Sequence, residues 1–185
     1  MAFSITSNVY VDLDDNGVPR LLSHIQQPYS ADDAGFEASA ITPVKLASQY
    51  VRDVAPIYQI DDKWLQSLEI KGPNSLSRKP TLLHLADQKT IRNTATISFV
   101  QTHAGLPVWQ AGVSVRLNKD SMLLTSSQSS VHLDLDLAVP GIRSADRKIL
   151  TSFSATKFAS NIGAKKTLAL HKPKQERLLI YRYDS

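Results

Sequence analysis

The sequence contains no cysteine among its 185 residues, which excludes disulfide bridges and thiolate chemistry. It also lacks any apolar run near the roughly 18 residues that a transmembrane helix requires, so we predict no membrane span. The N-terminal stretch has no basic segment followed by an apolar one, and we predict no signal peptide within the chain. A hydrophobic content of 42% and a charged content of 21% are ordinary for a globular domain.

Familiar catalytic patterns are absent as well. The sequence has no H-E-x-x-H, no G-x-S-x-G, no phosphate loop and no G-x-G-x-x-G. Asp134 and Asp136 would share one face of a strand, but carboxylates on a polar strand face are usually solvated rather than catalytic. No two histidines have the i, i+4 spacing that suits a metal on a helix; they are His24, His84, His103, His132 and His171. We therefore predict that the chain is not an enzyme and takes no cofactor or metal.

Charge is distributed unevenly along the chain. Residues 1–62 hold nine acids and three bases, a net of −6, and residues 63–185 hold eight acids and eighteen bases, a net of +10. The basic clusters 165–166 and 172–177 have few aromatic neighbours, whereas nucleic-acid surfaces usually interleave the two. We predict no nucleic-acid partner.

Residues 1–40 are predicted to form an N-terminal extension or arm. Residues 9–11 and 21–22 can pair across Asn16-Gly17, a favoured two-residue hairpin turn, although Pro19 would suit only an edge strand. The loop 12–17 also matches the first half of a calcium-binding loop, but its twelfth position is Ser23 instead of glutamate. A plain turn is the preferred interpretation, with weak calcium binding as the alternative. Residues 26–40 are polar and irregular, which is typical of a linker.

Residues 41–139 are predicted to form the main α+β domain. Thr42 as N-cap and Pro43 at the first position start a helix that Pro56 ends. Residues 61–65 suggest one capped helical turn, and residues 68–70 a short strand. Alternating apolar positions then indicate an antiparallel meander, with strands near residues 81–86, 95–100, 113–117, 122–125 and 131–139 and with 87–90 as a turn. We expect the helix to pack across this sheet, with one core made of Ile97, Phe99, Val113, Val115, Val51 and Val54. Residues 140–185 are predicted to form a smaller helix-and-hairpin unit.

Residues 97–108, ISFVQTHAGLPV, resemble the fungalysin/thermolysin propeptide domain, whose hallmark is a strand ending in Gln and then a turn with Gly-aliphatic-Pro-Val. The resemblance extends over residues 41–132. It departs from the family at Ser121, where glycine is usual, and the chain has no zinc-binding peptidase motif. Residues 140–185 are similar, more weakly, to the start of the PepSY-type module that often follows.

The resemblance implies a cystatin-like fold and a non-catalytic, propeptide-like role. Such a domain inhibits a secreted zinc metallopeptidase and assists its folding, with the peptidase in cis or in trans, and would be secreted or extracytoplasmic. The alternatives are a stand-alone interaction or structural module that has lost its peptidase, and a small-molecule-binding or enzymatic role for the same fold. The predicted partner-binding residues are Gln101, His103, Gly105, Pro107 and Trp109. The competing interpretation is that Gly105 and Pro107 serve only the turn and that Trp109 is core.

Overall fold

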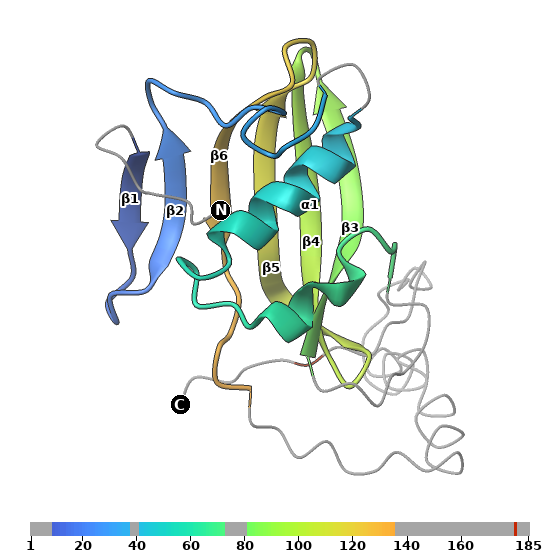
Figure 1. The fold of residues 1–185 in the computed structure, drawn as a ribbon. Helices are drawn as coiled ribbons and strands as arrows, with labels where there is room; N and C mark the ends of the chain where they lie inside the picture. The colour runs from blue at the N-terminus through green and yellow to red at the C-terminus, as the bar shows by residue number, and fades with distance from the viewer. Residues whose placement is uncertain (1–8, 38–40, 73–80, 136–179, 181–185) are drawn as a thin grey trace, which may run out of the picture. The chain divides into compact units, whose positions relative to one another are not determined.

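The computed structural model describes residues 9–37, 41–72, 81–135 and 180, all within the unit formed by Met1–Leu135 and Leu179–Ser185. In these residues one helix crosses the face of a six-stranded antiparallel sheet (Figure 1). The strand order is β1-β2-β6-β5-β4-β3. The elements are β1 (Val9–Leu13), β2 (Pro19–His24), α1 (Pro43–Val54), the 3-10 helix η1 (Asp62–Ser67), β3 (Thr81–Ile91), β4 (Thr94–His103), β5 (Leu106–Asn118) and β6 (Leu123–Ser129). The predicted α+β class is confirmed.

Helix α1 begins where its sequence signals place it. The side chain of Thr42 accepts a hydrogen bond from the backbone N–H of Lys45 at 3.3 Å, and Pro43 occupies the first turn. The helix ends at Val54, two residues before Pro56. Its sheet-facing side is almost fully buried and consists of Leu46, Ala47, Ser48, Tyr50, Val51 and Val54. The predicted helix and its apolar face are therefore confirmed.

The core lies between α1 and the centre of the sheet. Directly opposed apolar pairs connect β4 to β5: Ala95 with Leu117, Ile97 with Val115, and Phe99 with Val113. These side chains share one buried cluster with Val51 and Val54, as the alternation predicts. On the opposite face of the sheet the same strands pair polar residues, because successive side chains of a strand point to opposite sides.

The N-terminal hairpin is part of this sheet and not an arm attached to it. Val11 pairs with Leu22 as predicted, and Leu22 pairs in turn with Ser127 of β6. β2 is thus an internal strand, and Pro19 is tolerated because it is the first residue of that strand. Tyr29, in the stretch predicted as a linker, is 3% exposed and exchanges backbone hydrogen bonds of 3.1 and 2.8 Å with Leu124. The hairpin therefore belongs to the sheet, and the stretch that follows it contributes the buried Tyr29 and Ala31 to the interior.

Several predicted elements differ in the structure. β3 continues through residues 87–90, predicted as a turn, with an irregularity after Leu85; the turn lies at residues 92–93. Residues 68–70 form a turn and not a strand, and residues 131–135 lie outside any strand. Residues 87–90 are polar and have a low strand propensity, but they form a strand because they pair with β4. Residues 136–139 and the predicted unit 140–185, apart from Ile180, lie outside the described residues.

Candidate functional site

The tip of the β4–β5 hairpin is a tight two-residue turn. His103 and Leu106 are the last paired residues, and Ala104 and Gly105 connect them with φ values of 51° and 80°. Two successive positive φ values are characteristic of the hairpin turns whose twist matches that of the flanking strands. Glycine adopts such a φ without steric cost. The turn accordingly has one preferred shape.

Directly after the turn, β5 bulges away from β4. Between the pairs Thr102–Pro107 and Val100–Gly112, β4 contributes the single residue Gln101, whereas β5 contributes residues 108–111. Such a bulge bends the strand and redirects its side chains. Trp109 is consequently 47% exposed. The bulge thus presents a large aromatic side chain to solvent on a hydrogen-bonded hairpin.

The bulge ends at Gly112, where the two strands approach very closely. A Cβ atom added to Gly112 would lie 1.9 Å from the carbonyl oxygen of Phe99. No side chain fits at that distance, so glycine is required by the contact itself.

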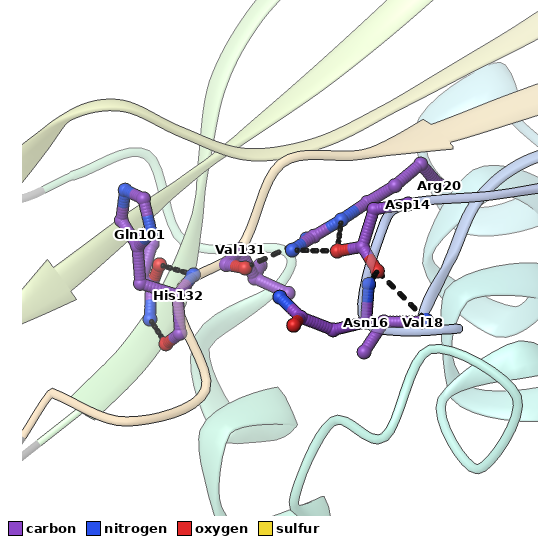
Figure 2. A network of polar contacts seen from close by, with 7 residues as sticks. All are labelled: Asp14, Asn16, Val18, Arg20, Gln101, Val131 and His132. Carbon is purple, nitrogen blue, oxygen red and sulfur yellow. Dashed lines mark hydrogen bonds and ion pairs between the residues drawn. The ribbon is translucent and has the colours of Figure 1, made fainter.

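Gln101 is completely buried, and its side chain has an internal role. Its Nε2 donates to the carbonyl oxygen of His132 at 2.8 Å, and its Oε1 accepts from the N–H of His132 at 2.9 Å (Figure 2). The side-chain amide therefore pairs with the main chain of His132 much as a neighbouring strand would. This pairing fixes the segment that follows β6.

The other predicted contact residues differ in exposure. His103 is 7% exposed, and its Nδ1 lies 3.0 Å from Thr81 Oγ1. Gly105 is buried and Pro107 half-buried. Trp109 is thus the most solvent-exposed of the five predicted residues. The competing interpretation, that Trp109 is part of the core, is wrong. Direct partner contacts by the five residues stay a prediction.

A second set of polar contacts holds the same segment from the N-terminal hairpin. Arg20 donates from Nη1 to the carbonyl oxygen of Val131 at 2.9 Å, and its Nε donates to Asp14 Oδ2 at 2.8 Å (Figure 2). Asp14 also accepts from the N–H groups of Val18 and Asn16, both at 2.9 Å. These bonds, with the one from Val18 foremost, lower the pKa of the half-buried Asp14 carboxyl. Arg20 therefore binds the main chain of Val131, and Gln101 binds the main chain of the next residue, His132, from the other side.

The same contacts bear on loop 12–17, for which weak calcium binding is the alternative interpretation. The carboxylate of Asp14 already accepts three hydrogen bonds from within its own hairpin and forms an ion pair with Arg20 Nη2 at 2.8 Å. Over residues 9–37, 41–72 and 81–135, no three His, Asp or Glu side chains gather closely enough to hold a metal ion. Residues 14–18 connect β1 to β2 as a turn, closed by a hydrogen bond of 2.9 Å from the Asp14 N–H to the Val18 carbonyl oxygen, and Asp12 and Leu13 belong to β1. The predicted two-residue turn at Asn16-Gly17 is therefore wrong, because the connection is longer.

Beneath α1, buried hydroxyl groups connect the helix to the sheet. Tyr50 Oη lies 3.1 Å from Ser127 Oγ and 3.0 Å from His24 Nε2. Tyr58 Oη lies 2.6 Å from the same Ser127 Oγ and donates to the Ser127 carbonyl oxygen at 3.0 Å. Burial raises the pKa of Tyr58 to about 12 and lowers the pKa of His24. These groups are neutral at pH 7 and closed off from solvent, so they hold the helix on the sheet.

Sequence reasoning missed this hydroxyl network and the Arg20 contacts. Their partners are far apart in the chain: 77 residues separate Tyr50 from Ser127, and 111 separate Arg20 from Val131. The available signal was the spacing of Tyr50 within the apolar face of the predicted helix, which indicates burial but not a partner.

Two further findings bear on function. In the described parts of the chain, no helix combines the length and the apolar character needed to cross a bilayer. The sequence matches no protein-family model, and no curated protein is similar enough to count as a match.

Proposed function

We propose that this chain is a non-catalytic, propeptide-like domain that binds and restrains a zinc metallopeptidase, supplied in cis or in trans. The observation that supports the proposal best is the exposure of Trp109 on the bulged, hydrogen-bonded β4–β5 hairpin. The resemblance of residues 97–108 to the fungalysin/thermolysin propeptide domain names the class of partner.

The physical argument rests on the shape of the hairpin. Aromatic anchors dominate interface free energies, and tryptophan is among the most enriched of them. The tight turn, the bulge and the Gln101–His132 pairing already fix the main chain around Trp109. A preformed surface loses less conformational entropy on docking. An aromatic anchor on a preformed main chain suits docking onto an enzyme, and it would inhibit the enzyme by covering its active-site cleft.

We further propose that the fold is cystatin-like and that the domain acts outside the cytoplasm. The helix crossing an antiparallel sheet supports the first part, and the class of partner supports the second. The N-terminal hairpin of β1 and β2 would then be an addition to the cystatin-like fold. It extends the sheet beyond β6, the last strand of the meander.

The test is inhibition in trans. The purified chain is added to the mature metallopeptidase encoded by the same gene or its neighbour, and hydrolysis of a peptide substrate is measured. We expect inhibition at or below tens of micromolar, because about 7 kcal/mol of binding free energy gives substantial occupancy there. Trp109→Ala should weaken inhibition by at least tenfold, about 1.4 kcal/mol. Ile91→Ala is the matched control, since Ile91 is also exposed, at 61%, but ends β3.

Equal weakening by both variants would show that Trp109 is no special anchor. No inhibition at tens of micromolar, or a gene neighbourhood without a metallopeptidase, would favour the stand-alone interaction module instead. Peptide hydrolysis by the purified chain itself, abolished by a chelator, would contradict the non-catalytic assignment.

A further inference from the structure

Part of β5 has no strand of the main sheet beside it. The β4 partners of β5 jump from Pro107 to Gly112, and its β6 partners begin at Val113. Residues 108–111 therefore lie in the described sheet without ladder partners. Main-chain groups in such a stretch are a ready template for another extended segment.

One residue from the far end of the sequence uses this template. Ile180 donates its N–H to the carbonyl oxygen of Pro107 at 2.9 Å, and its carbonyl oxygen accepts from the N–H of Trp109 at 2.8 Å. The result is a parallel bridge between Ile180 and Val108. An aliphatic residue in extended main chain thus pairs beside the exposed Trp109.

We propose that Pro107–Trp109 is a strand-addition site for an extended peptide that places an aliphatic residue opposite Val108, and that Ile180 of the same chain occupies this site in cis. In this mode of recognition, main-chain hydrogen bonds supply affinity and the flanking side chains supply specificity. Val108, 2% exposed, fixes the template to the core, and Trp109, 47% exposed, offers apolar area to whatever lies alongside. The inference holds whether or not the partner is a peptidase.

Occupation in cis has a measurable consequence. A tethered segment competes with a peptide offered from outside, at an effective concentration that the length of the tether sets. A peptide offered from outside must therefore bind the intact chain more weakly than a chain whose own segment cannot pair. Proline at position 180 has no N–H to donate to Pro107, so it removes one of the two hydrogen bonds of the bridge and should weaken the pairing strongly.

The experiment uses two full-length proteins and two peptides. A fluorescent peptide with the sequence of residues 177–185, RLLIYRYDS, is titrated into the wild-type chain and into Ile180→Pro, and anisotropy is measured. The control peptide carries proline in place of the isoleucine. We expect the isoleucine peptide to bind Ile180→Pro at least tenfold more tightly than wild type. The proline peptide should bind neither protein.

Each other result overturns part of the proposal. No binding to Ile180→Pro, or equal binding of both peptides, would show that Pro107–Trp109 is not a strand-addition site. Equal binding of the isoleucine peptide to both proteins would show that Ile180 does not occupy it.

Hydrogen exchange of the wild-type chain measures the protection of the Trp109 amide, and this measurement does not require the variant to fold. The Trp109 amide should exchange at least tenfold more slowly than an open amide. It should lose this protection in Ile180→Pro, while the Val113 amide in the β5–β6 ladder keeps its own. An unprotected Trp109 amide in wild type would overturn the pairing itself. Inhibition of a metallopeptidase is not measured in either experiment, so the two proposals can fail separately.

Discussion

The two ends of the β4–β5 pair are held in place by different forces. At the end nearest Asn118, opposed apolar side chains such as Ile97 and Val115 form an unbroken ladder. At the hairpin end the buried side chains of β4 are polar, and Gln101, Thr102 and His103 each have a hydrogen-bond partner. Apolar burial tolerates many neighbours, whereas a buried amide requires one particular partner. In the β4–β5 pair, the irregular geometry therefore lies at the end where polar groups of β4 specify the packing.

The largest effect is expected at Gly112, where the regular half of the pair, residues 94–100 with 112–118, meets the bulge; the hairpin end, residues 101–111, is the polar half. Gly112→Ala should lower the free energy of unfolding by about 5 kcal/mol, at the extreme of single substitutions, because a Cβ cannot coexist with the Phe99 carbonyl. Gly17→Ala is the control: Gly17 also has positive φ but nothing within 4 Å, so only about 1 kcal/mol of backbone strain is expected. Urea denaturation measures both. Similar losses in the two variants would mean that the close approach at Gly112 is not as described.

Phe99→Ala tests the regular half alone. The side chain is 2% exposed and packs in the cluster beneath α1, so we expect a loss of roughly 3–5 kcal/mol in the free energy of unfolding. Ser98→Ala, on the opposite face of the same strand, should change it by less than about 0.5 kcal/mol. If the two substitutions cost the same, the helix does not cover the face that we assign to the core.

Gln101→Ala tests the polar half. It leaves the N–H and carbonyl oxygen of His132 without the side-chain amide, so we expect a loss of about 1–3 kcal/mol. The His132 amide should also exchange faster with solvent. Gln128→Ala removes the same side chain from an exposed position on β6 and should be nearly neutral. An unchanged exchange rate at His132 would contradict the internal role of Gln101.

The smallest expected effect concerns His24, a buried polar group outside both halves. Desolvation lowers its pKa below the ordinary 6.5, although the Gln27 carbonyl and the Asp33 carboxylate act in the other direction. The unfolded chain therefore binds a proton below pH 6.5 that the folded chain does not. Stability should fall as the pH is lowered from 6.5 toward the folded pKa. His24→Gln should flatten this part of the Tm profile against pH; an identical slope in both proteins would show that another group titrates.

Local patterns predicted the regular half well. The alternation around Ile97 and Val115 located the strands, and Thr42 and Pro43 located the start of the helix, because these signals operate over a few residues. The bulge could not be predicted, because no local pattern marks it and Gln101, the residue opposite it, pairs with a residue 31 positions away. The length of β3 was underestimated because residues 87–90 are polar and owe their strand conformation to ladder pairing. Trp109 was identified as a candidate, but its exposure depends on the bulge.

The pairing of the N-terminal hairpin with β6 also constrains how the protein folds during synthesis. Arg20 and Val131 are 111 residues apart, so at typical translation rates roughly 5–20 s pass between their emergence from the ribosome. Throughout that interval β2 has no strand on its inner edge, and the apolar side of α1 has no complete sheet to cover. Contacts so distant in sequence also slow the search for the native topology. We therefore expect the nascent chain to depend on a holding chaperone until its last strand has been made.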